Sequence, residues 1–284
     1  MLARRAAVLA SLLASLALPA QPHAADPQPA LAPAGVPAAA PVPVTPTAPE
    51  LTVDLGTAAA ISGAELGLSG LTVAFKAQLV APTCRWCEPP RLDRWARRRL
   101  VWHDPGAAGT ASDLFQFVVP AGAMATLWIQ ATPHGDREVA EDLLVLAESA
   151  STAILLTQVA KLSVGRLRQD AWARGTIESP DDKLSFWSGH TSFAFGAAAA
   201  ATQIARLRGR PGWRWLGLAT FSAAAITGYL RVAANRHWLT DVVSGAAVGG
   251  ATGLLVPLLA YRPAGGRKPA VLLVPAPGGF AVVF

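Results

Sequence analysis

The segment from Leu230 to Asp241 carries three residues that can do chemistry, set between apolar, alanine-rich stretches. His237 and Asp241 are four residues apart, a spacing that places both on one face of a helix. A carboxylate beside an imidazole fixes the tautomer of the ring and prepares it as a nucleophile or a base. Arg231 offers a planar fork of donors suited to an oxyanion. The pattern therefore predicts a site for a phosphate.

A second group of basic residues ends the long apolar stretch before residue 161. Lys161, Gly165 and Arg168 stand at i, i+4 and i+7, which is one helix face if the helix continues through them. The glycine leaves room for a ligand to approach the backbone. Basic residues at a helix C-terminus are also common as a solvated flank, so this segment alone decides nothing.

The third segment is Phe186-Trp-Ser-Gly-His-Thr-Ser192. Ser188 is a good N-cap for a helix that begins near His190. The free N–H groups of Gly189 and His190 would then form an anion site, with His190 placed to give or take a proton. A lone histidine at a helix start is often structural. Three such segments at the same end of a bundle instead predict one shared anion pocket.

Long uncharged stretches must position these residues. They cover 112–130, 143–160, 191–205, 215–230 and 242–261, and they are rich in small residues that allow close helix packing. Hydrophobic residues make up 52% of the chain and charged residues 15%, values between those of a soluble globule and a strongly hydrophobic membrane protein. We expect an all-α, membrane-embedded bundle of about five to six long helices. The tail VLLVPAPGGFAVVF predicts a short C-terminal hairpin.

Composition divides the chain into four parts. Residues 1–24 resemble a secretory signal, and 25–50 form a linker of proline and alanine. Residues 51–262 form the helical domain, whose motifs lie within about 110–260. Residues 263–284 form the C-terminal tail.

The net charge of +6 accompanies no nucleic-acid-binding motif, so we expect a membrane and an anionic substrate as partners. Under the positive-inside rule, two basic clusters would face the cytoplasm and the site would face the periplasm from the inner membrane. A soluble periplasmic protein is the alternative, because the basic stretch from Lys76 to Arg99 fits only as a peripheral segment or in a bundle that does not span. Its part DRWARRRLVWHD is typical of an amphipathic helix at a surface. The two clusters are Arg206, Arg208, Arg210 and Arg214, and Arg262, Arg267 and Lys268.

Cys84 and Cys87 are the two cysteines of the chain, and an exported protein favours a disulfide between them. A zinc site would need two further ligands, and His103 alone is too little. A thioredoxin-like redox role needs a βαβ context that the sequence lacks.

Taken together, the three segments resemble the signature of the type 2 phosphatidic acid phosphatase and vanadium haloperoxidase superfamily. That signature reads Lys-x6-Arg-Pro, Pro-Ser-Gly-His and Ser-Arg-x5-His-x3-Asp. Three positions depart from it: Gln169 and Trp187 replace prolines, and Leu230 replaces the serine. The matching positions are Lys161 and Arg168, Ser188 to His190, and Arg231, His237 and Asp241.

The resemblance implies a phosphatase that works without metal or cofactor, through a covalent phosphohistidine. By it, His237 attacks phosphorus, Asp241 holds its ring, and His190 protonates the leaving alcohol. Phosphate oxygens would be bound by Lys161, Arg168, Ser188, Gly189 and Arg231. We expect phosphomonoesters, such as phosphatidic acid, or polyprenyl diphosphate as substrates. The alternatives are a vanadium-dependent haloperoxidase and a non-catalytic, phosphate-binding bundle.

Overall fold

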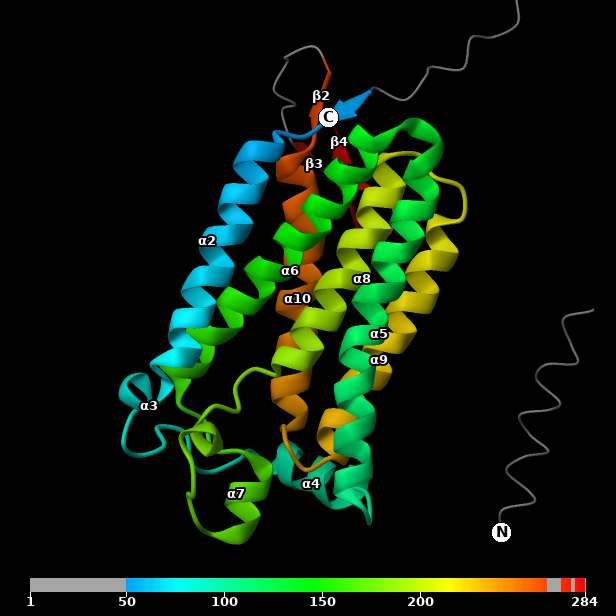
Figure 1. Ribbon diagram of the computed structural model, residues 1–284. Helices are drawn as coiled ribbons and strands as arrows, with labels where there is room; N and C mark the ends of the chain where they lie inside the picture. The colour runs from blue at the N-terminus through cyan, green and yellow to red at the C-terminus, as the bar shows by residue number, and fades with distance from the viewer. Residues whose placement is uncertain (1–49, 265–271, 277–278, 284) are drawn as a thin grey trace, which may run out of the picture. The chain divides into compact units, whose positions relative to one another are not determined.

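The computed structural model describes residues 50–264, 272–276 and 279–283, and six long helices dominate this part (Figure 1). The predicted all-α bundle is thus confirmed. The long helices are α2 (Leu55–Ala74), α5 (Pro105–Ala131), α6 (Asp136–Val164), α8 (Gly189–Leu207), α9 (Trp213–Ala233) and α10 (Leu239–Ala260). The short elements are α3 (Lys76–Leu79), α4 (Arg91–Leu100), α7 (Gln169–Arg174), η2 (Thr132–His134), η3 (Pro180–Lys183), β1 (Leu51–Thr52) and β2 (Arg262–Pro263).

The pattern of contacts between Cα atoms divides the chain into two units, Met1–Pro46 and Thr47–Phe284. Every described element belongs to the second unit. The predicted signal 1–24, nearly all of the linker 25–50, Arg267 and Lys268 lie outside the described residues. The predicted C-terminal hairpin is present as β3 (Leu272–Ala276) and β4 (Gly279–Val283), which pair antiparallel.

Helix α8 lies at the centre of the bundle and contacts α5, α6, α9 and α10. Its alanine run, residues 197–201, is fully buried. The closest approach is to α10, where Gly245, Gly249 and Gly253 follow one another at four-residue spacing. A Cβ at Gly249 would overlap the carbonyl oxygen of Ser192, so only glycine allows the two backbones to pack this closely.

The outer faces of the bundle are apolar. Large side chains such as Phe117, Ile129 and Leu259 are more than half exposed. Four helices among the described residues are long and apolar enough to cross a membrane: Pro105–His134, Asp136–Val164, Trp213–Ala233 and Leu239–Ala260. This agrees with the predicted membrane-embedded bundle.

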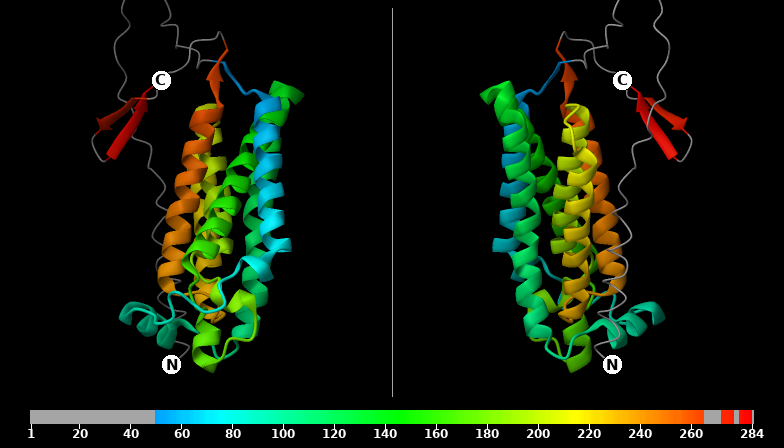
Figure 2. Two further views of the ribbon diagram at one scale, coloured as in Figure 1. Left: turned by 90° about the vertical axis from the view of Figure 1, so that its left-hand side faces the viewer. Right: turned by 90° about the vertical axis from the view of Figure 1, so that its right-hand side faces the viewer.

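At one end of the bundle, α6 and α9 finish while α8 and α10 begin, and α4 and α7 lie across this end (Figures 1 and 2). Helix α4 is amphipathic, but it turns a carboxylate toward the bundle and its large apolar side chains outward. Asp93 and Ala96 are buried against the bundle, whereas Leu92 and Trp95 are about half exposed. The basic stretch that ends at Arg99 therefore lies at the end where the three motif segments meet.

The opposite end is closed by buried ion pairs. Arg208 donates to Glu141 and Asp142, each at 2.8 Å, and Arg210 pairs with Glu138. The hydroxyl of Tyr261 donates to Asp142, and β1 pairs with β2 beside it. Arg208 and Arg210 are thus buried residues held in ion pairs, rather than members of a solvated flank. The sequence pattern does not show this burial.

Candidate active site

His237 lies in the short connection between α9 and α10, and its side chain is 1% exposed. Its Nδ1 lies 2.9 Å from the carbonyl oxygen of Ser185. A carbonyl oxygen can only accept, so Nδ1 carries the proton and Nε2 keeps its lone pair. Burial, followed by the charges of Arg168, Arg231 and Lys161, holds the pKa of His237 well below its ordinary value. The ring is therefore neutral and nucleophilic at neutral pH.

Asp241 does not hold the ring directly, contrary to expectation. Its Oδ2 lies 3.6 Å from Nδ1 of His237, beyond hydrogen-bonding distance. The two residues do not share a helix face, because α10 begins at Leu239, after His237. The oxygens of Asp241 instead accept from Arg166, from the Ser185 hydroxyl and from the N–H of Trp238. The carboxylate is linked to the ring through Ser185, whose hydroxyl donates to Asp241 and whose carbonyl oxygen accepts from Nδ1.

Lys161 and Arg168 do not lie on one continuous helix face. Gly165 ends α6 in the left-handed conformation, with φ of +59°, and its N–H returns to the carbonyl oxygen of Lys161. Arg168 therefore lies outside α6, where its Nε donates to the carbonyl oxygen of Asp181 at 2.7 Å. The break turns Arg168 toward a cavity, while Lys161 stays in the last turn of the helix.

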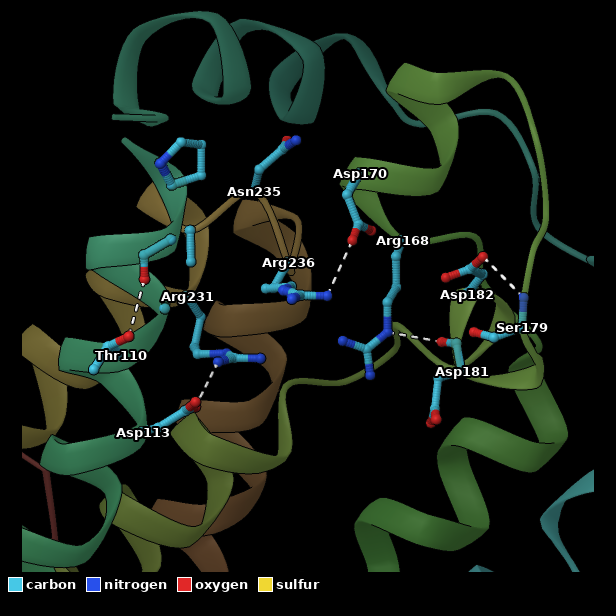
Figure 3. Close-up of a pocket in the computed structure, with 14 residues that line it drawn as sticks. Thr110, Asp113, Arg168, Asp170, Ser179, Asp181, Asp182, Arg231, Asn235 and Arg236 are labelled. Atoms are coloured by element: carbon cyan, nitrogen blue, oxygen red, sulfur yellow. Dashed lines mark hydrogen bonds and ion pairs between the residues drawn. The ribbon is translucent and has the colours of Figure 1, made fainter. Parts of the chain in front are cut away.

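Arg168 and Arg231 line the same cavity, which has a volume of about 680 Å³ (Figure 3). Arg231 is 6% exposed, and one of its terminal nitrogens donates to Ser112 at 2.9 Å and to Asp113 at 3.1 Å. Arg236 lines the cavity too and pairs with Asp170. Three arginines and four aspartates thus line the cavity, and the arginines are the groups that could bind negative oxygens of a ligand. The aspartates are Asp113, Asp170, Asp181 and Asp182.

The start of α8 faces Lys161. Ser188 is the N-cap, as predicted, and its hydroxyl accepts from the N–H of Thr191. A Cβ at Gly189 would lie 3.6 Å from the Lys161 ammonium nitrogen, an ordinary contact distance, so this cation lies beside the first turn of α8. His190 follows directly, and its Nε2 lies 2.8 Å from Asp113. The three motif segments therefore converge: Lys161 lies beside Gly189, His190 and Arg231 share Asp113, and Arg231 and Arg168 line one cavity. His237, His190 and Lys161 lie behind the lining of that cavity.

Four residues of this arrangement were not predicted from the sequence. Asp113 contacts both Arg231 and His190, and it is the single charged residue between Ser112 and Gln130, a signal that could have found it. Ser185 contacts His237 through its backbone carbonyl oxygen, which any residue would supply, so its residue type does not point to the site. Arg166 and Asp93 pair with each other at 2.5 Å, and both are buried.

Two of the three departures from the family signature, Leu230 and Trp187, have structural explanations, and nothing in the structure explains Gln169. Leu230 packs in an apolar cluster with Ala108, Ala233 and Ala234. The indole N–H of Trp187 donates to the hydroxyl of Thr157 at 2.8 Å, so this side chain anchors its loop to α6. Gln169 is fully buried at the start of α7.

Comparison with known proteins confirms the family resemblance. The profile described as the PAP2 superfamily matches residues 142–263. The chain is 30% identical to the lipid A 1-phosphatase of Porphyromonas gingivalis over 154 residues, which are 54% of this chain and 31% of that protein. It therefore spans less than a third of that relative's length.

Two solved structures are also similar. LpxE of Aquifex aeolicus has 20% identity and a TM-score of 0.41, over 59% of this chain and 93% of that one. A transmembrane PAP2-type phosphatidylglycerolphosphate phosphatase of Bacillus subtilis has 19% identity and a TM-score of 0.44, over 71% of this chain and 94% of that one.

Proposed function

We propose that this chain, whose residues 142–263 match the profile of the PAP2 superfamily, is a phosphatase that hydrolyses the phosphomonoesters of lipids. One observation carries the proposal. The imidazole of His237 is buried and neutral, its Nε2 lone pair is free by the tautomer argument, and the charges of Arg168, Arg231 and Lys161 act on it. Such a ring is a nucleophile placed where a phosphate would be bound.

In this reaction, Nε2 of His237 attacks phosphorus and forms an N–P bond while the P–O bond to the alcohol breaks. Burial and the charge of Arg231 lower the pKa of His190 to about 4 in the free site, so the bound phosphate must raise it. The imidazolium formed in this way gives its proton to the departing oxygen. A water then attacks the phosphohistidine and passes a proton to His190. His237 leaves with the electrons of the N–P bond, and inorganic phosphate is released.

The charge that develops on the equatorial oxygens is met by the three cations and by the helix N-terminus at Gly189. These groups are held in position before the reaction, as the bonds of Arg168 to Asp181 and of Arg231 to Ser112 indicate. Side chains thus supply the role that a metal ion has in other phosphatases. We propose a metal-independent reaction, which an excess of chelator should leave unchanged.

A lipid substrate is supported by the position of the cavity at the end of an apolar bundle. Helix α5 contributes Asp113 to the cavity, while its next residues, Leu114 and Phe117, are 62% exposed. A headgroup could bind in the cavity while its acyl chains remain in the bilayer. The P. gingivalis relative acts on lipid A by its name, which makes lipid A the first substrate to test.

We further propose that the site faces the periplasm from the inner membrane. Cys84 and Cys87 form a disulfide, and the backbone between them pairs with Gly165 and Leu167 at the site's end. Disulfides persist in oxidising compartments. Arg206 and Arg214 lie at the other end, as the positive-inside rule requires of the cytoplasmic side. Labelling of Arg98→Cys, but not Arg214→Cys, by an impermeant thiol reagent on intact spheroplasts would support this orientation.

The function is tested by measuring phosphate release from lipid A, phosphatidic acid, polyprenyl diphosphate and soluble phosphoesters. The wild type should hydrolyse at least one lipid phosphate, and His237→Ala should release none. Radiolabelled substrate should label the wild type transiently at an acid-labile position. Full activity of His237→Ala would disprove the mechanism. Vanadate binding without turnover would favour the non-catalytic bundle, and halide oxidation with vanadate would favour the haloperoxidase.

A further inference from the structure

Arg166 is a buried arginine next to the site that makes no contact with the cavity. Its side chain is 1% exposed, and its guanidinium bridges two carboxylates that are 0% exposed. One terminal nitrogen donates to Asp241 at 2.5 Å and the other donates to Asp93 of α4 at 2.5 Å. A planar fork that satisfies two buried carboxylates at once is a geometry that lysine cannot provide.

Helix α4 is fastened to the start of α10 through the same group. Asp93 accepts from the N–H of Thr240 at 2.9 Å and from its hydroxyl at 2.7 Å, while Arg166 donates to that hydroxyl. Thr240 directly precedes Asp241. The position of α10 relative to His237 therefore depends on a carboxylate that comes almost 150 residues earlier in the chain.

The disulfide-closed loop of residues 84–87 covers the other side of Arg166. The ring of Trp86 lies 3.8 Å from the guanidinium carbon, as in a cation–π contact. The N–H of Arg85 donates to the carbonyl oxygen of Gly165 at 2.9 Å, and the N–H of Leu167 donates to that of Trp86 at 3.0 Å. The backbone on both sides of Arg166 is thus held by the loop.

The contacts continue from Asp241 to the reactive ring. The other oxygen of Asp241 accepts from the Ser185 hydroxyl at 2.5 Å, and the carbonyl oxygen of Ser185 is the partner of His237 Nδ1 at 2.9 Å. An unbroken series of buried polar contacts therefore runs from Asp93 through Arg166, Asp241 and Ser185 to His237. Each member is at most 1% exposed.

We propose that Arg166 is a positioning residue for His237, and that Asp93 and Trp86 hold it in place. Helix α4 and the loop of residues 84–87 precede the segment matched by the family profile, so the working site extends beyond that segment. The effect on turnover rests on the proposed phosphatase function. The effect on the ring of His237 does not, because it follows from the hydrogen bonds alone.

Asp93→Asn is the test variant, because it keeps the size of the side chain and weakens the ion pair with Arg166. Asp93 does not line the cavity. Arg166→Lys keeps the charge and removes the fork. Asp142→Asn is the matched control, since Asp142 is also a buried carboxylate bonded to an arginine, but at the far end of the bundle. Each variant is compared with the wild type by melting temperature, kcat and KM, and by nitrogen NMR of histidine-labelled protein with the His237 signal assigned from His237→Gln.

Asp93→Asn and Arg166→Lys should lower kcat by about 10²-fold with KM changed by less than about twofold, as a misplacement near 1 Å does. Both should shift the His237 nitrogen signals, and Asp142→Asn should change neither kcat nor those signals. If Asp93→Asn resembles Asp142→Asn in kcat and leaves the His237 signals unmoved, the positioning role is wrong. If the signals shift but the wild type hydrolyses no phosphoester, the positioning role stands and the proposed function is wrong.

Discussion

The glycines of α10 offer a sharp test of how the bundle aligns the two halves of the site. Helix α8 carries Ser188 and His190 at its start, and α10 follows His237 directly. In Gly249→Ala, the new Cβ would lie 2.8 Å from the carbonyl carbon of Ser192 and would overlap its oxygen. Carbon atoms in contact are normally about 3.5–4.0 Å apart, so α8 and α10 must separate by about 1 Å.

The expected size of the effect follows from that displacement. Overpacking of this kind destabilises a protein by about 1–3 kcal/mol. A shift near 1 Å between His190 and His237 should lower kcat by about 10²-fold, which is about 2.7 kcal/mol of transition-state stabilisation. Both values are measured on detergent-solubilised protein, by thermal melting and by phosphate release per folded enzyme.

Gly250→Ala is the matched control, because a Cβ at Gly250 would meet nothing within 4 Å. This change should leave kcat as it is and stabilise the helix by about 0.5–1 kcal/mol, since glycine is a poor helix former. The reasoning is refuted if Gly249→Ala has the melting temperature and kcat of Gly250→Ala. The two helices would then not set the geometry of the site.

Three further predictions concern the site. Arg231→Lys should weaken vanadate binding about 10-fold, because lysine cannot donate to Ser112, Asp113 and an anion in the same plane. Calorimetry measures the dissociation constant. The same change at half-exposed Arg236 is the control and should weaken binding less. The double change Cys84→Ser and Cys87→Ser should destabilise the protein by about 2 kcal/mol by the chain-entropy estimate. It should also lower kcat, because the loop pairs with the backbone of Gly165 and Leu167. An unchanged kcat would mean that the loop does not support this segment. The pKa of His237 lies well below its ordinary 6.5, so below that pH the unfolded chain binds a proton that the folded protein does not. The free energy of unfolding should therefore fall as the pH drops below about 6.5, by up to about 1.4 kcal/mol per pH unit, and denaturation of His237→Gln should lack this part of the slope.

The bundle and the convergence of its motifs could be predicted because they follow from local patterns. Each apolar stretch is long enough for one helix, and successive helices reverse direction. Lys161 near the end of one helix, His190 at the start of another and Arg231 near the end of a third must then come to the same end of the bundle. Spacing alone thus led to the neighbourhood of His237, but it could not show that the hydrogen-bond partner of Nδ1 is the carbonyl oxygen of Ser185.

The buried support of the site could not be predicted, because its parts are neither adjacent nor distinctive. Asp93 is one acid in a segment that contains five arginines, and the net charge of that segment hides a carboxylate that faces inward. Arg166 stands between Lys161 and Arg168, two better candidates. Only the packing of α4 against α10 shows that these two residues neutralise each other in a place from which water is excluded.

Trp187 shows how a departure from the family signature can keep the geometry that the signature ensures. A proline restricts a loop through its fixed φ angle. Trp187 restricts the same loop through its side chain, because its indole N–H donates to Thr157, one helical turn before Lys161 on α6. The loop that presents the Ser185 carbonyl to His237 is thereby tied to the helix that carries Lys161. The loop that contacts the nucleophile and the helix that carries the cation are thus joined by a direct hydrogen bond.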